Sequence, residues 1–201
     1  MILDAIKTPD QVTTNFQNRI VVATGHRPNK CGGYTTAAQL LLKQIAIAWM
    51  AALKPRGALS GMALGWDTAI VQACLHFGLP YVACIPFQGQ ESQWPSSSQR
   101  AYYYYLRHAA KVIVCSPGGY SSYKMQIRNE RMIDMALHYG PGQNNSILLA
   151  MWDGTSGGTK NCLLYAHTRI QTINAWSHFL IHSSLPKLGQ SPSNQRIHET
   201  S

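Results

Sequence analysis

Residues 58–77 read ALSGMALGWDTAIVQACLHF. The short apolar run at 58–59 predicts a strand, the glycine-containing segment 60–66 a loop, and the amphipathic segment 67–77 a helix. A strand that passes through a tight glycine turn into a helix is the repeating unit of α/β proteins. This stretch therefore predicts a parallel sheet with helices packed against it.

The same unit recurs along the rest of the chain. Compact β-branched runs predict further strands at 19–23, 81–85, 111–115 and 146–152, and a last edge strand is expected at 173–181. Apolar residues at helical spacing predict further helices at about 36–53, 100–109, 125–139 and 159–167. In the first of these the expected apolar stripe is Leu40, Leu41, Ile45, Trp49 and Leu53. The predicted fold class is α/β, a Rossmann-like three-layer sandwich with a mostly parallel central sheet flanked by helices.

The length of 201 residues suits one such domain with tails. We expect an N-terminal arm at 1–18, a single Rossmann-like domain at 19–182 and a flexible polar tail at 183–201. The arm lacks the basic and apolar arrangement of a secretory signal. The apolar stretch 37–53 is interrupted by polar side chains and looks too short for a membrane span, so we expect a cytoplasmic protein with no membrane partner.

The chain carries 17 Lys and Arg against 8 Asp and Glu, which gives a formal net charge of +9. Two interpretations stay open: the protein is simply short of acids, or its partner is anionic. The basic residues are spread along the chain rather than gathered in one tract. This distribution favours a small anionic ligand over a long nucleic-acid footprint, although a nucleic-acid partner stays possible.

The five cysteines are scattered, and no two of them form a C-x-x-C pair. The sequence therefore predicts neither a metal site nor a disulfide framework. Cys84 and Cys115 lie inside apolar runs and are expected to be small buried residues.

Glycine-rich turns follow the predicted strands at 24–28, 60–65, 116–119 and 153–158. In a parallel sheet such turns share the edge at the carboxyl ends of the strands, where ligands bind. In the turn of residues 60–67, Gly61 and Gly65 let the backbone approach a ligand closely, and N–H groups at the helix start favour an anion. Asp67 either caps the helix or binds a ribose hydroxyl.

The segment 153–159, DGTSGGT, repeats this arrangement after the strongest predicted strand. Two glycine-rich cradles at one sheet edge suggest a ligand with more than one phosphate, or with a phosphate and a sugar. The alternative is a plain glycine-rich turn with Thr159 as the N-cap of the next helix. With both cradles considered together, we favour ligand contact for Asp67.

The first predicted strand is followed by Thr24, Gly25, His26 and Arg27. A planar guanidinium suits phosphate, whereas His26 is equally well explained as a structural histidine. Trp94, in an otherwise polar loop, would either stack on a base or pack as a lid residue.

No residues assemble into a catalytic set. The sequence contains no Ser-His-Asp order, no metal-ligand spacing and no nucleophile elbow. The candidates for a general acid or base are Glu130, Asp67 and Asp153. Both aspartates also have structural interpretations.

Five segments together resemble the YpsA-like branch of the SLOG superfamily. They are TGHRP at 24–28, SGMALGWD at 60–67, PFQGQESQW at 86–94, RNERMID at 128–134 and WDGTSGGT at 152–159. The resemblance covers roughly residues 19–175. It implies a Rossmann-like fold that binds nucleotides, or nucleotide-derived molecules such as ADP-ribose, at the strand ends, in proteins that commonly form homo-oligomers.

The resemblance also implies a ligand site. Its first cradle would contain Gly61, Gly65 and Asp67, and its second Gly157, Gly158 and Thr159. We also expect ligand contacts from the neighbouring Ser60, Met62, Trp66 and Asp153. Arg128 and Asn129 would lie between the cradles, with Thr24, Gly25, His26 and Arg27 on the near side and Trp94 as a possible stacking residue.

One departure from the superfamily concerns activity. LOG-type phosphoribohydrolases carry P-G-G-x-G-T-x-x-E after the fourth strand, whereas residues 117–122 read PGGYSS and the glutamate is missing. We therefore expect a sensor or a sequestering protein for a nucleotide-derived signal, with no certain cofactor. A hydrolase of N-glycosidic or phosphate bonds and a binder of single-stranded nucleic acid are the alternatives.

Overall fold

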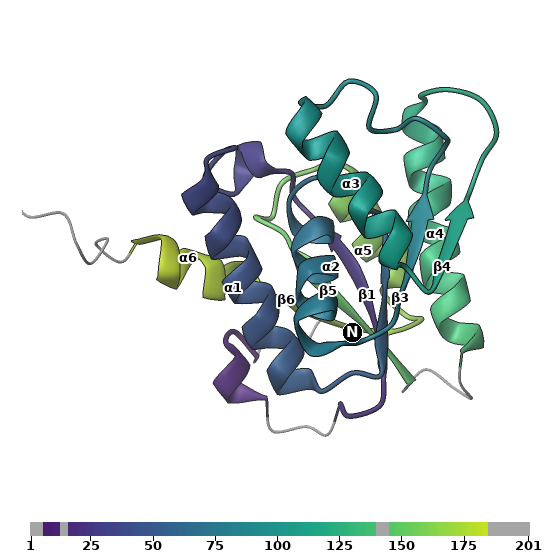
Figure 1. Ribbon diagram of the computed structural model, residues 1–201. Coiled ribbons are helices and arrows are strands. Elements are labelled where there is room, and N and C mark those ends of the chain that lie inside the picture. Colours follow the sequence, from purple (N-terminus) through teal and green to yellow (C-terminus); the bar gives the residue numbers. More distant parts are fainter. Residues whose placement is uncertain (1–5, 13–15, 140–144, 185–201) are drawn as a thin grey trace, which may run out of the picture.

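A computed structural model describes residues 6–12, 16–139 and 145–184 of the chain. Strands and helices alternate along it (Figure 1), and the first half contains β1 (Ile20–Gly25), α1 (Thr36–Leu53), β2 (Gly57–Ser60), α2 (Trp66–Phe77), β3 (Tyr81–Ile85) and α3 (Ser96–His108). The second half contains β4 (Lys111–Val114), α4 (Ser122–His138), β5 (Ser146–Met151), α5 (Gly158–Ala166), β6 (Gln171–Asn174) and α6 (Trp176–Ser184). Two 3-10 turns are η1 (Pro9–Gln11) and η2 (Pro28–Lys30).

The strands form one parallel sheet in the order β4-β3-β2-β1-β5-β6. The chain starts at β1 in the middle, moves outward to β4, and returns so that β5 pairs with β1 from Ile20↔Ser146 to Gly25↔Met151. Strand order therefore reverses between β1 and β5. In open parallel sheets such a reversal leaves a crevice beyond the carboxyl ends of the two strands. The predicted Rossmann-like α/β class is confirmed.

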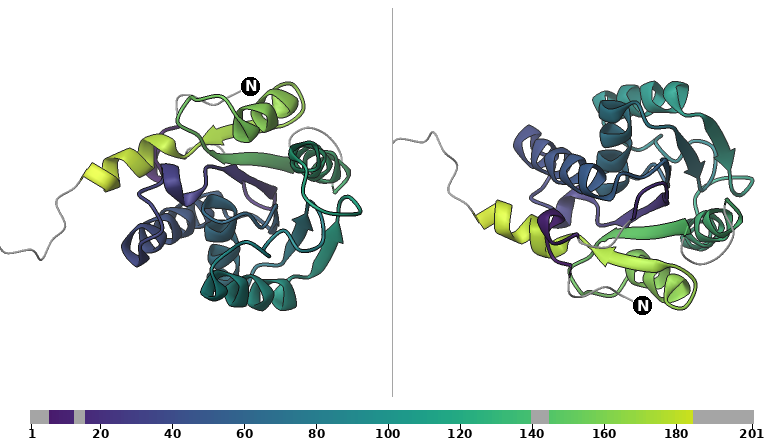
Figure 2. Two further views of the ribbon diagram at one scale, coloured as in Figure 1. Left: turned by 90° about the horizontal axis from the view of Figure 1, so that it is seen from above. Right: turned by 90° about the horizontal axis from the view of Figure 1, so that it is seen from below.

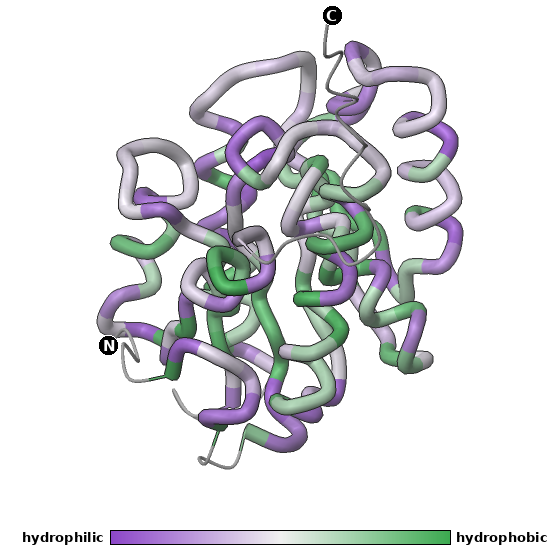
Figure 3. Tube along the Cα trace, turned by 90° about the vertical axis from the view of Figure 1, so that its left-hand side faces the viewer, coloured by the Kyte–Doolittle hydropathy of each residue, from purple (hydrophilic) through white to green (hydrophobic). Residues whose placement is uncertain are grey.

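Helices cover both faces of the sheet (Figure 2). One buried cluster joins the sheet to α1, α2 and α6, and a second joins it to α4 and α5. Along β5, Leu149 belongs to the first cluster and Leu148 to the second, as the two-residue period of a strand requires. Because both faces are covered, the central strands are continuous apolar runs, and hydrophobic segments run through the middle of Figure 3.

Helix α1 follows the expectation for 36–53, and the Thr35 side chain caps it by accepting a hydrogen bond from Ala38 N. The expected apolar stripe is partly wrong, because Leu40 is 51% exposed whereas Leu42 is buried. By length and composition α1 does meet the criterion for a membrane-crossing helix, contrary to our expectation. Its buried side chains join the core cluster on the sheet, which identifies it as a core helix.

Both edges of the sheet differ from expectation. The strand expected at 173–181 ends at Asn174, whose Oδ1 accepts hydrogen bonds from the N–H groups of Trp152 and Trp176, and α6 follows. On the opposite edge β4 is not buried on both faces, since Val112 and Val114 are 41% and 48% exposed.

Several boundaries also shift. The helices α3 and α4 begin at Ser96 and Ser122, a few residues earlier than expected. Cys84 is buried as predicted, whereas Cys115, beyond the end of β4, is only half-buried.

The described part of the N-terminal arm packs on the domain. Ile6 and Phe16 belong to the buried cluster on the α1 side of the sheet, and η1 contacts α1. The predicted flexible tail lies outside the described residues from 185 onward, and residues 183–184 belong to α6.

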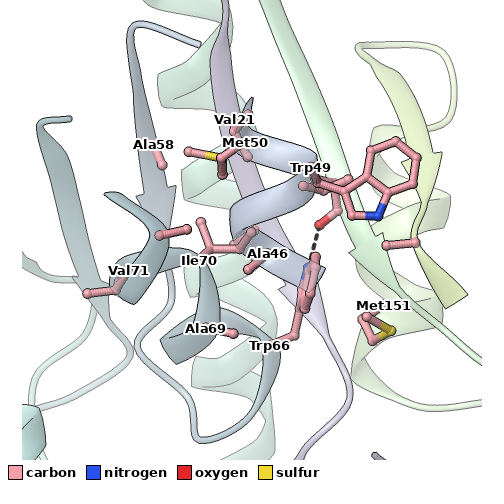
Figure 4. Close-up of a cluster of buried hydrophobic side chains, with 14 of the residues drawn as sticks. Val21, Ala46, Trp49, Met50, Ala58, Trp66, Ala69, Ile70, Val71 and Met151 are labelled. Carbon is pink, nitrogen blue, oxygen red and sulfur yellow. Dashed lines mark hydrogen bonds between the residues drawn. The ribbon is translucent and has the colours of Figure 1, made fainter. Parts of the chain in front are cut away.

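The start of α2 is anchored between β1 and β5 by the fully buried Trp66 (Figure 4). Its Nε1 donates to Leu149 O at 3.0 Å. Gly25 permits this contact, because a Cβ there would lie 2.6 Å from the Trp66 Cβ. Gly65 has φ +99°, and a Cβ on it would lie 2.6 Å from His26 O. These two glycines therefore bring the loops after β1 and β2 together.

His178 on α6 yields a prediction about pH. Its ring lies 6.0 Å from that of Trp49 and 4.6 Å from that of His182. Burial and the neighbouring His182 lower the pKa of His178, and Asp10 opposes the shift. As the pH falls through the ordinary pKa of 6.5, residue 178 is therefore protonated in the unfolded chain before it is protonated in the folded protein. Protonation thus favours the unfolded chain, and the free energy of unfolding falls in this pH range.

We expect urea denaturation to show a smaller loss of stability between about pH 7.5 and pH 5.5 in His178→Phe than in the wild type. His138→Phe, on the exposed end of α4, serves as the control and should behave as the wild type. Equal losses in all three proteins would contradict the assignment.

Candidate functional site

A cavity of about 460 Å³ lies where the order of the strands reverses. Its lining comes from the end of β1, from η2, from the β2–α2 loop, from α4, and from the β5–α5 loop with the start of α5. Ligand pockets in proteins typically measure roughly 300–1,000 Å³. The cavity is therefore large enough for a small organic ligand.

The structure brings many of the expected site residues together. Those that line the cavity are Thr24, Gly25, His26, Arg27, Asp67, Arg128, Asn129, Gly157, Gly158 and Thr159. They come from segments far apart in the sequence, and parallel pairing of β1 with β5 places their ends side by side. The turns after β1 and β5 therefore converge at one sheet edge, as expected.

The other expected residues do not line the cavity. Ser60, Met62 and Trp66 are fully buried in the framework. The Ser60 hydroxyl donates to Asp67 O and accepts from Met62 N, which fixes the β2–α2 loop. Trp94 lines a separate, smaller cavity beside α3, with its ring 5.4 Å from that of Tyr102.

At the base of the cavity Asp67 and Arg128 form a buried ion pair. Their side chains are 5% and 8% exposed, and Arg128 Nη1 lies 3.1 Å from Asp67 Oδ2. The same carboxylate oxygen accepts a hydrogen bond from Ala63 N at 3.4 Å. Burial raises the pKa of Asp67, while the positive charge of Arg128 opposes that shift.

Gly61 makes room for this ion pair. A Cβ at position 61 would lie 1.2 Å from Arg128 Nη1, so only glycine lets the guanidinium lie against the backbone there. Arg128 Nε is buried and has no hydrogen-bond partner among the described residues. A buried donor without a partner is costly, so the position of this guanidinium is held by its ion pair with Asp67 and not by its Nε.

A second network joins the loops after β1 and β5. His26 Nε2 lies 2.6 Å from Asp153 Oδ1, and Lys30 Nζ lies 3.2 Å from Asp153 Oδ2 and also donates to Thr155 Oγ1. Burial works against ionisation of Asp153, but hydrogen bonds from Thr155, His26 and Lys30 outweigh it and lower its pKa. Asp153 therefore remains an anion that ties the two loops together behind the cavity.

The start of α5 supplies backbone donors. Gly157 is the N-cap with φ 140°, and the first helical bond runs from Asn161 N to Gly157 O. Among the described residues the N–H groups of Gly158, Thr159 and Lys160 have no acceptor. Such groups favour an anion.

Cations outnumber anions on the cavity lining. Arg27, Lys30 and Arg128 face a single acid, Asp67, which is already paired with Arg128. The Arg27 side chain is exposed, and its guanidinium makes no hydrogen bond to another described residue.

Sequence reasoning expected Arg128 and Asn129 on α4 but missed the rest of the wall that this helix forms. Ser122, Met125 and Gln126 line the cavity beside Asn129, together with Tyr120. Their positions relative to Asn129 fit one helix face, so the spacing around this residue was a signal that could have found them. Lys30 and Thr155, which lie close in sequence to Arg27 and Asp153, were also missed.

The catalytic candidates are not assembled around the cavity. Glu130 does not line it and instead accepts a hydrogen bond from Gln126 Nε2 at 2.8 Å. Within the described segments, no group of three or more His, Cys, Asp or Glu side chains could hold a metal ion.

The fold and the site define a Rossmann-like α/β protein with a cation-lined cavity at the switch point of its parallel sheet. The chain is 31% identical to the uncharacterized SPbeta prophage-derived protein YoqJ of Bacillus subtilis (strain 168) over 126 residues, covering 54% of this chain and 67% of the relative. The protein therefore belongs to the same family as YoqJ. No protein-family model matches the chain.

Among solved structures the chain is similar to DNA processing protein A of Streptococcus pneumoniae. The identity is 15% and the TM-score 0.42, over 83% of this chain and 62% of that protein. The chain thus spans less than two thirds of that neighbour.

The buried ion pair yields a prediction about stability. Asp67→Asn keeps the size of the side chain but leaves the Arg128 charge unpaired, so we expect a loss of about 3–5 kcal/mol in chemical denaturation. The double variant Asp67→Asn/Arg128→Met should recover part of that loss. Asp134→Asn, which breaks the half-exposed pair with Arg169, is the control and should cost less than about 1 kcal/mol. Similar losses for the two single variants would disprove this role of Asp67.

Proposed function

We propose that this protein binds a small phosphorylated ligand, a nucleotide or a nucleotide-derived signal of the ADP-ribose type, in the cavity between β1 and β5. Arg128 carries the proposal. Its guanidinium is buried, fixed by Asp67 and accommodated by Gly61, and its Nε donor has no partner among the described residues. A fixed, partly unsatisfied guanidinium at the base of a cavity suits a phosphate oxygen.

The rest of the lining supports an anionic ligand. Arg27 and Lys30 line the cavity from the segment that follows β1, and the start of α5 contributes its backbone N–H groups. Two separate groups of donors can hold two phosphates, or one phosphate and a sugar. The net charge of +9 would also favour the approach of an anion.

We propose binding without catalysis, as in a sensor or a sequestering protein. Asp67 is committed to Arg128 and Ala63 N, and Asp153 to the loops behind the cavity. Glu130 lies off the cavity lining. None of the three carboxylates is free to act as a general acid or base, a task that requires access to the reacting atom.

On the basis of the sequence motifs, we propose that the protein is a member of the YpsA-like branch of the SLOG superfamily. With it we propose a homo-oligomer in the cytoplasm. The prophage origin of YoqJ makes the cytoplasm of an infected host one setting for this protein.

Arg27 offers the direct test, because its exposed guanidinium can be removed with little effect on folding. We expect Arg27→Ala to bind ADP-ribose and pyrophosphate about 10-fold more weakly than the wild type in calorimetry, since a charge-assisted hydrogen bond is lost. Arg100→Ala, on exposed α3, is the matched control and should bind as the wild type does. No heat from the wild type with either probe would refute the proposal.

Two further measurements separate the alternatives. Incubation with AMP and NAD followed by chromatography should return both unchanged, and cleavage of either would establish a hydrolase instead. Oligonucleotides should bind with an affinity that does not grow with their length. Affinity that rises with length and falls steeply with salt would establish a binder of single-stranded nucleic acid.

A further inference from the structure

The groups that line the cavity differ in the hydrogen bonds they can make. Arg27, Lys30, Arg128 and the start of α5 offer donors, most of them charged. The stripe on α4, formed by Ser122, Met125, Gln126 and Asn129, carries no charge. A ligand in this cavity therefore meets charged donors that suit phosphate and a stripe of uncharged side chains that suits an uncharged group.

Gln126 has a fixed orientation on the α4 stripe. Its Nε2 lies 2.8 Å from Glu130 Oε1, one helical turn further along α4. An ionised carboxylate can only accept hydrogen bonds, so the amide nitrogen of Gln126 must face it. Because Gln126 lines the cavity and Glu130 does not, the carbonyl oxygen, which this contact does not use, is the acceptor that Gln126 can offer to a ligand.

Asn129 has the same polarity for a similar reason. Its Nδ2 donates to Gly158 O, in the first turn of α5, at 3.4 Å. A backbone carbonyl can only accept, so this contact also assigns the amide nitrogen and leaves Oδ1 without a partner among the described residues. Asn129 is 6% exposed and lines the cavity, so a ligand in the cavity can contact its side chain.

We infer that the α4 wall selects a ligand whose uncharged part carries a hydrogen-bond donor, either a sugar hydroxyl or the amino group of a base. This inference rests on the proposed function, because it assumes that the phosphate is bound by Arg27, Lys30, Arg128 and the start of α5. Gln126 and Asn129 determine specificity by accepting from that donor, and Glu130 is a positioning residue that holds Gln126. A ligand without such a donor covers these acceptors without pairing them, which lowers its affinity.

Calorimetry with matched probes tests the inference. The probes are AMP, 2′,3′-dideoxyadenosine monophosphate, which lacks the sugar hydroxyls, purine riboside monophosphate, which lacks the amino group, and pyrophosphate. We expect at least one stripped analogue to bind the wild type about 5- to 10-fold more weakly than AMP, the effect of one hydrogen bond. The weaker analogue identifies the donor as hydroxyl or amine. Equal affinity for AMP and both analogues would overturn the inference.

Variants then locate the acceptor by a thermodynamic cycle. Gln126→Met should lower the affinity for AMP toward that of the weaker analogue, and should change the affinity for pyrophosphate less. Glu130→Gln lets the Gln126 amide turn, because residue 130 then both donates and accepts, so the AMP-to-analogue ratio should shrink at an unchanged melting temperature.

Three results would contradict the inference. One is an equal loss for AMP and pyrophosphate in Gln126→Met. Another is an unchanged ratio in Glu130→Gln. The third is no binding of AMP or pyrophosphate to the wild type. If ADP-ribose does not bind either, the proposed function is refuted as well, whereas the first two results leave phosphate binding intact.

Discussion

The site depends on one buried ion pair, between Asp67 at the start of α2 and Arg128 in the middle of α4. The two helices lie on opposite faces of the sheet, so the pair meets beyond the strand ends, where no strand separates the faces. Two buried charges are tolerated only when each satisfies the other. This requirement fixes α2 and α4 relative to each other, and with them two sides of the cavity.

Glycines make that arrangement possible for steric reasons. Gly61 leaves space for the Arg128 guanidinium, Gly25 for Trp66, and Gly65 for His26 O. A loop packed this tightly cannot move freely, so the site is rigid on its α2 side. On the other side, the Asp153 network joins the β1 and β5 loops through the buried His26 and the more exposed Lys30.

Much of the fold could be predicted because the central strands are buried on both faces and are therefore unbroken apolar runs. The edges could not, since β4 loses burial at the end of the sheet and the turn at Asn174 depends on side-chain hydrogen bonds to a neighbouring strand. In the site, the turns after β1 and β5 followed from topology. A glycine beside a ligand and a glycine beside a buried guanidinium look alike in a sequence. The role of Gly61 is therefore visible only in the folded structure.

The pairing of β1 with β5 also determines when the site can form. Ile20 and Ser146 lie 126 positions apart, and α5 follows later still. Local units such as β1–α1–β2 can form early on the ribosome, but this long-range closure is slow. Until residues near 161 have been synthesised, the cavity that Arg27 and Arg128 line lacks the backbone N–H groups at the start of α5. The proposed ligand site is therefore incomplete in a nascent chain until α5 has formed.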